Sequence, residues 1–149
     1  MSNGWNTFVT DFQFVFIQDD RWKSLFQGLG NTLVITFFAV MIGIVLGAIV
    51  ATVRTTYDKN NGDMKKRNPV GFYILSIANV ICKLYLTVIR GTPVVVQLMI
   101  AYFIIFATSN NSTAVAVFAF GINSGAYVAE IIRGGIMSID EGQFEAGRS

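Results

Sequence analysis

The chain contains no histidine, one cysteine and two prolines among its 149 residues. Without histidine it cannot build a Ser–His or Cys–His nucleophilic site, and a zinc or haem centre is not expected. The lone Cys82 excludes a disulfide within the chain. No Gly-x-x-x-x-Gly-Lys-Ser/Thr phosphate loop occurs, so the chain does not bind ATP through that motif. We therefore expect neither catalysis nor a cofactor.

Charged residues are also scarce. They make up 13% of the sequence, against about 25% in soluble domains, whereas 53% of the residues are hydrophobic. The net charge of +2 is too small to indicate nucleic-acid binding. Residues 24–53 carry no charge at all, and this run is longer than the roughly 20 residues that a membrane helix needs. The composition therefore predicts an all-α integral membrane protein.

The first 23 residues do not have the pattern of a cleavable signal peptide. Such a peptide has a basic start and an apolar core, whereas this segment holds three acids and two bases. Its aromatic side chains alternate with polar ones, a composition that suits the lipid headgroup layer. We expect residues 1–23 to form an extracytoplasmic tail on the membrane surface. A docking surface for a partner protein is the alternative.

Small residues recur every four positions in the first predicted span, residues 32–53. They are Ala39, Gly43, Gly47 and Ala51. Small side chains let helix backbones approach closely in lipid, where no hydrophobic force holds helices together. Glycine is common in membrane helices in general. We interpret the pattern as a helix-packing face, within this subunit or against a second one.

A polar segment follows at residues 54–68, with five bases and two acids. Basic residues close to a membrane span accumulate on the cytoplasmic side. We therefore place this segment in the cytoplasm as a loop and the N-terminus outside. Binding of lipid headgroups would use the same bases and does not conflict with that placement.

Three apolar segments come next, at residues 70–89, 91–108 and 114–132. Polar side chains of the first segment fall on one helical stripe. They are Ser76, Asn79, Lys83, Thr87 and Arg90. A charged residue such as Lys83 near the bilayer centre would cost at least about 2.5 kcal/mol, so we expect residues 70–89 to form an amphipathic helix at the interface. The alternative is a span whose polar stripe faces a pathway.

The second and third spans are then expected at residues 93–108 and 114–133. Near the end of the third, Glu130 and Arg133 are three positions apart and share one helical face. They could form an ion pair that orients the segment after them, remain a solvated pair, or contact substrate. Uncharged polar groups in these segments could line a pathway or bond neighbouring helices to one another. They are Asn79, Gln97, Asn123 and Ser124.

Four motifs occur in order along the chain. They are residues 28–33 (Gly-Leu-Gly-Asn-Thr-Leu), the turn Arg90, Gly91, Thr92 and Pro93 with residues 94–98 after it, residues 125–135 with Tyr127, Glu130, Arg133 and Gly134, and residues 142–148. Together they resemble the permease subunits of polar amino-acid ABC importers of the histidine, glutamine and arginine uptake type. The resemblance covers about residues 28–149 and implies a type I, MetI-like permease core.

Residues 134–149 are similar to the family's cytoplasmic EAA coupling loop, and the sequence stops inside it. The resemblance implies that a short helix here docks on the ATPase. Its docking residues would be Gly142, Gln143, Glu145, Ala146 and Gly147. Gly147 stands where the family usually has alanine, and glycine costs about 1 kcal/mol of helix stability relative to alanine. We expect residues 24–149 to be a truncated permease domain.

The resemblance also implies partners: ATPase subunits, a second permease subunit in a homo- or heterodimer, an extracytoplasmic substrate-binding protein and an amino-acid substrate. It implies a location in the bacterial cytoplasmic membrane. Two other classes stay open from the residues alone. One is a channel or secondary-transporter fragment, with Lys83, Glu130 and Arg133 along an ion path. The other is a small membrane anchor or assembly protein that uses its aromatic tail.

Overall fold

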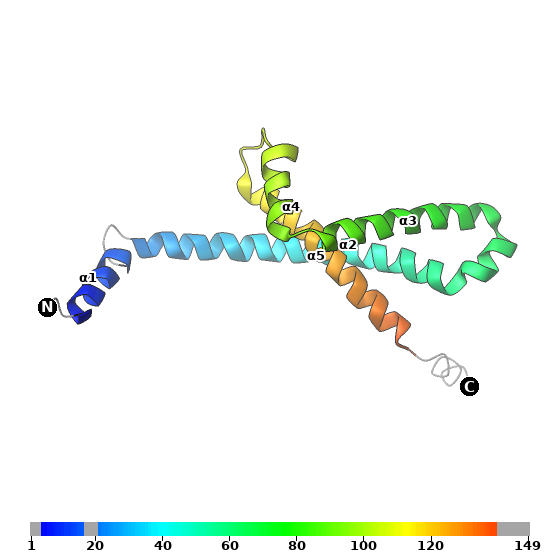
Figure 1. The fold of residues 1–149 in the computed structure, drawn as a ribbon, viewed down its shortest axis with the longest axis horizontal. Coiled ribbons are helices and arrows are strands. Elements are labelled where there is room, and N and C mark those ends of the chain that lie inside the picture. The colour runs from blue at the N-terminus through cyan, green and yellow to red at the C-terminus, as the bar shows by residue number, and fades with distance from the viewer. Residues whose placement is uncertain (1–3, 17–20, 140–149) are drawn as a thin grey trace. The chain divides into compact units, whose positions relative to one another are not determined.

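The structure is a computed structural model that describes residues 4–16 and 21–139, with the side chains of residues 60–67 left undescribed. Its elements are α1 (Gly4–Phe16), α2 (Arg21–Arg67), α3 (Pro69–Gly91), α4 (Val94–Ile100), the π-helix η2 (Ala101–Ile105) and α5 (Ser112–Met137) (Figure 1). The predicted all-α class is confirmed. The chain divides into two compact units, Met1–Ile35 and Thr36–Ser149.

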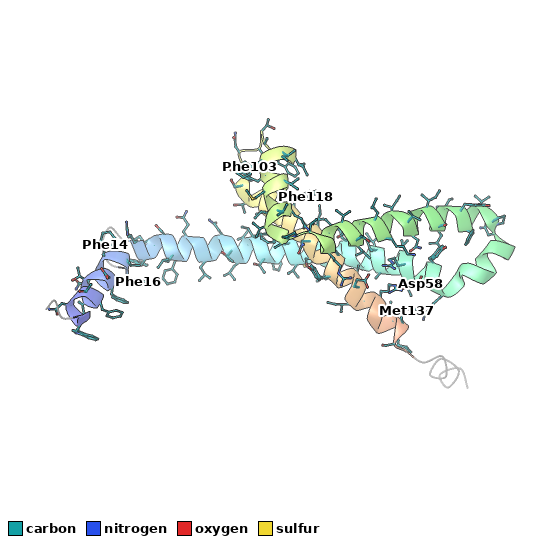
Figure 2. The ribbon with its side chains drawn as sticks, in the orientation of Figure 1. Phe14, Phe16, Asp58, Phe103, Phe118 and Met137 are labelled. Carbon is teal, nitrogen blue, oxygen red and sulfur yellow. The ribbon has the colours of Figure 1, made fainter. Side chains whose placement is uncertain are left out.

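In the first unit, the aromatic side chains of α1 form a ladder along one helix. The rings of Trp5 and Phe8 are 5.9 Å apart, and those of Phe12 and Phe16 are 4.8 Å apart. The guanidinium of Arg21 lies 4.6 Å from the centre of the Phe14 ring; Phe14 and Phe16 are labelled in Figure 2. The N-terminal segment therefore contains a regular helix, and its location on the membrane surface stays a prediction.

Helix α2 is longer than the sequence predicted. It begins at Arg21 rather than at residue 32 and continues to Arg67, so most of the predicted loop at residues 54–68 is helical. The correction has a simple cause, because lysine, arginine and methionine are good helix formers and no proline interrupts the chain before Pro69. The polar residues from Arg54 to Arg67 indicate only that this half of the helix lies outside the hydrocarbon core of the membrane.

Helix α3 starts at Pro69, directly after the capping residue Asn68. The Asn68 side chain accepts a hydrogen bond from the Gly71 N–H at 3.1 Å, and Pro69 occupies the start of the helix. α3 then runs back beside the second half of α2 (Figure 1), where the rings of Tyr57 and Phe72 stack at 6.3 Å. The predicted range, residues 70–89, is helical throughout.

Residues 93–108 do not form one continuous α-helix. α4 ends at Ile100, and η2 continues it only to Ile105. At 1.5 Å per residue, Val94–Ile105 measures about 18 Å, short of the roughly 30 Å hydrocarbon core. α5 then begins after Asn111, whose side chain accepts from the Ala114 N–H at 3.0 Å. It ends at Met137, so residues 134–137 are helix and not loop.

Three segments of the described chain are long and apolar enough to cross a membrane. They are Arg21–Lys59, Pro69–Gly91 and Ser112–Met137. The number of candidate spans thus agrees with the prediction, but length and composition select α3 instead of residues 93–108. Two apolar clusters lie along α5. One joins Val50 and Leu86 to Ala126 and Ala129, and the other joins Ala101 to Val115 and Ala119.

Candidate functional site

The small residues of α2 lie on the face that packs against α5. Ala39, Gly43, Gly47 and Ala51 are all buried. A Cβ atom built on Gly43 would lie 2.6 Å from Ser124 Oγ, and one built on Gly47 would lie 2.5 Å from Val128 Cγ1. The close approach is reciprocal, because a Cβ on Gly125 would lie 3.0 Å from Leu46 Cβ. The two backbones are therefore near each other because side chains are missing on both.

An ion cluster lies directly after this packed face. Glu130 Oε1 accepts a hydrogen bond from Arg54 Nη1 at 3.1 Å and lies 3.7 Å from Arg90 Nη1. One carboxylate thus holds two guanidinium groups, one from the end of α3 and one from α2. The Arg54 side chain is only 13% exposed, so this pair is shielded from water much more than a surface salt bridge.

Arg133 has a separate partner one turn further along α5. Its Nε and Nη2 both donate to Asp58 Oδ2, at 3.0 and 2.7 Å. Asp58 projects from α2 and is labelled in Figure 2. The structure does not pair Glu130 with Arg133, which share a helix; each contacts α2 instead. Charge-assisted bonds of this kind fix the last turns of α5 against α2.

Glu130 and its two arginine partners lie at one level along the three helices that carry them. Arg54 follows the charge-free residues 24–53 of α2, and Glu130 follows the charge-free residues 91–129. Arg90, at the start of the second charge-free stretch, contacts the same carboxylate as Arg54. Residues 91–129 therefore leave the level of the ion cluster and return to it, and none of them is charged.

The turn at residues 90–93 is held by a polar network. Gln97 Nε2 donates to the Ile89 carbonyl at 2.6 Å and to Thr92 Oγ1 at 2.7 Å, while Gln97 Oε1 accepts from Asn123 Nδ2 at 3.0 Å. Thr92 has extended backbone angles before Pro93, as expected for a residue that precedes proline. Both Gln97 and Asn123 thus bond neighbouring helices.

Other candidate residues have different surroundings. Asn79 is 2% exposed, and its Oδ1 has no hydrogen-bond partner among the described residues. Tyr127 is half-exposed, with the Arg90 guanidinium 5.8 Å from its ring centre. A Cβ atom built on Gly134 would have no neighbour within 4 Å outside its own helix backbone. The predicted docking residues, Gly142, Gln143, Glu145, Ala146 and Gly147, lie outside the described residues.

A polar hollow of about 500 Å³ adjoins the ion cluster. Its lining comes from α2, α3 and α5 and includes Arg54, Lys83, Thr87, Arg90 and Glu130. The sequence indicated Lys83 and Glu130 separately but not their proximity to Arg54. The sequence places Arg54 only among the bases after the first span. Arg54 and Glu130 are each the first charged residue after a long apolar run. This shared position is the signal that could have predicted their contact.

The chain is similar to bacterial transport permease proteins. It is 33% identical over 143 residues to the L-cystine transport system permease protein TcyB of Bacillus subtilis, covering 95% of this chain and 54% of that protein. It is 36% identical over 127 residues to the glutamine transport system permease protein GlnP of Escherichia coli K12, covering 83% of this chain and 50% of GlnP. No protein-family model matches.

A solved structure agrees in both sequence and fold. The crystal structure of an amino acid ABC transporter with histidines is 37% identical, with a TM-score of 0.58 over 78% of this chain and 48% of that one. The matched proteins share one class: they are permease proteins of transport systems, and the solved structure is an ABC transporter. More narrowly, the chain is a relative of the amino-acid transport permeases, as its motifs predicted. It spans about half the length of the curated relatives that it matches.

Proposed function

We propose that this chain is part of a permease subunit of an ATP-driven amino-acid importer. It contributes helices to the translocation pathway and contacts a separate ATPase subunit, which hydrolyses the ATP. The similarity to amino-acid transport permeases over most of the chain is the observation that carries this proposal. A second permease subunit and an extracytoplasmic substrate-binding protein complete the proposed assembly in a bacterial cytoplasmic membrane.

The ion cluster supports a route for mechanical coupling. Residues 142–147 follow α5 in sequence, and the last turns of α5 are fixed to α2 by Glu130 and Arg133. A force applied after Met137 therefore reaches α2 through two charge-assisted contacts. We propose that the cluster transmits the closure of the ATPase to the membrane helices.

Glu145→Lys tests the proposed contact with the ATPase. In the assembled transporter that contains this chain, we expect the variant to reduce both copurification of the ATPase and amino-acid uptake by tenfold or more, since two charge units change at a docking surface. Membrane insertion should be unchanged. Asp11→Lys, on the exposed face of α1, makes the same charge change elsewhere and should have no effect. Normal uptake with Glu145→Lys would remove this residue from the contact.

The level marked by Glu130 also supports a topology. Arg90 and Arg54 contact the same carboxylate, so they lie on the same side of the membrane. If α3 crossed the membrane, both would lie on the outer side. The charged half of α2, which runs beside α3, would then have to cross the membrane as well. We propose instead that α2 crosses within residues 24–53 and that α3 lies on the cytoplasmic side. Residues 91–129 then cross outward and back. Because α4 and η2 together measure only about 18 Å, residues 91–93 and 106–111 complete the outward limb.

Cysteine labelling distinguishes this topology from one in which α3 crosses. With Cys82 replaced by serine, we expect a cysteine at Thr92 to react with an impermeant maleimide only from the cytoplasmic side. A cysteine at Asn111 should react only from outside, and one at Lys59 only from inside. Both schemes place Asn111 outside, so this position serves as the control. Lys59 lies in the charged half of α2, which would cross with α3 in the other scheme, so it tests the same difference as Thr92. Labelling of Thr92 from outside would establish that α3 crosses.

A further inference from the structure

The polar hollow beside Glu130 has more positive than negative charge. Arg54, Lys83 and Arg90 line it together with a single carboxylate, that of Glu130. This carboxylate already contacts both arginines. Among the described residues, no ion pair or hydrogen bond involves the Lys83 ammonium. Thr87, one turn after Lys83 on α3, also lines the hollow, and its hydroxyl donates to the Lys83 carbonyl oxygen at 2.8 Å. The hollow therefore offers hydrogen-bond donors and an unneutralised positive charge to an anion.

Exposed apolar side chains directly follow three of the lining residues in sequence. On α3, Leu84 is 64% exposed and Val88 is 50% exposed, and on α5 Ile131 is 72% exposed. The hollow also lies at the level where the charge-free stretches of α2 and α5 end. A ligand that fits both features has a phosphate headgroup and acyl chains. Basic pockets between helices at the cytoplasmic membrane surface have the physical properties needed to bind anionic lipid headgroups.

We infer that this hollow binds the phosphate headgroup of an anionic phospholipid, with Lys83 and Arg90 as the principal contacts. Free phosphate has the same oxyanion chemistry, but the exposed apolar side chains on the same helices and the charge-free stretches that end at this level favour the lipid. The inference rests on the proposed position of this level at a membrane surface. It does not depend on transport, so a failure of uptake and a failure of lipid binding are separate results.

The test is a binding titration on the purified chain in a neutral detergent, read by native mass spectrometry. Short-chain phosphatidylglycerol should bind at least tenfold more tightly than phosphatidylcholine with the same acyl chains. Lys83→Gln should weaken phosphatidylglycerol binding about fivefold, since a basic residue near a lipid surface contributes about that factor. Lys83 is exposed and lies outside the ion pairs, so the variant should retain its helical circular dichroism.

Lys23→Gln, which removes the same charge from the first unit, is the matched control and should leave the affinity unchanged. Equal binding of the two lipids would overturn the inference, and so would equal weakening by Lys83→Gln and Lys23→Gln. Inorganic phosphate that binds as tightly as phosphatidylglycerol would assign the hollow to free phosphate instead. Displacement of the lipid by an amino acid would assign it to the transported substrate.

Discussion

Gly47→Ala should destabilise the packing of α2 on α5 by about 1–3 kcal/mol, the usual cost of overpacking. The new methyl group would meet Val128 Cγ1 at 2.5 Å and the Ala129 backbone nitrogen at 3.0 Å. Neither neighbour can move freely, because a valine in a helix has essentially one rotamer and a backbone atom moves only with its helix. Thermal unfolding in detergent should show a lower midpoint for the variant.

Gly30→Ala is a control on the same helix. A Cβ atom at Gly30 has nothing within 4 Å, so the substitution should be neutral or raise the unfolding midpoint slightly, because alanine favours helix by about 1 kcal/mol. The comparison separates close packing from helix propensity. If both variants unfold at the same temperature, α2 and α5 do not pack through Gly47.

Glu130→Gln should lower both stability and uptake. The substitution keeps the size of the side chain but leaves Arg54 and Arg90 facing a neutral amide. Removing one member of a fully buried ion pair costs about 3–5 kcal/mol, and because Glu130 is 28% exposed we expect roughly 2 kcal/mol. The measurements are the unfolding midpoint of the purified protein and amino-acid uptake by the assembled transporter.

A double-mutant cycle isolates the contact between Glu130 and Arg54. Arg54→Gln combined with Glu130→Gln removes both charges, so the double variant should be more stable than the sum of the two single effects predicts, by about 1 kcal/mol or more. Asp11→Asn, an exposed acid on α1, is the control and should change neither measurement. Additive effects of the two substitutions would contradict an interaction between these side chains.

Much of the fold could be predicted from local chemistry. The break at residues 90–93 follows from proline and its effect on the preceding residue, and the start of α3 follows from Asn68 and Pro69. The small residues of α2 were found from their spacing alone. These features are encoded within one turn or one helix face, where sequence spacing determines position.

The remaining features depend on contacts between distant segments. The helix from Arg54 to Arg67 differs from the predicted loop because polar residues do not end a helix where no proline interrupts it. Arg54, which donates to Glu130, is 76 positions away from it, and Asp58, which accepts from Arg133, is 75 positions away. No local sequence pattern indicates either contact. A same-helix pair is worth only about 0.2–0.5 kcal/mol, so the packing of α5 on α2 decides the outcome.

The continuous α2 helix has a mechanical consequence. No break separates its charge-free part from residues 54–67, which extend about 21 Å beyond the end of that part. A tilt of about 10° in the membrane part would therefore sweep the far end of the helix through about 4 Å. We therefore expect a small rotation at Arg54 to become a displacement of several ångströms at Arg67.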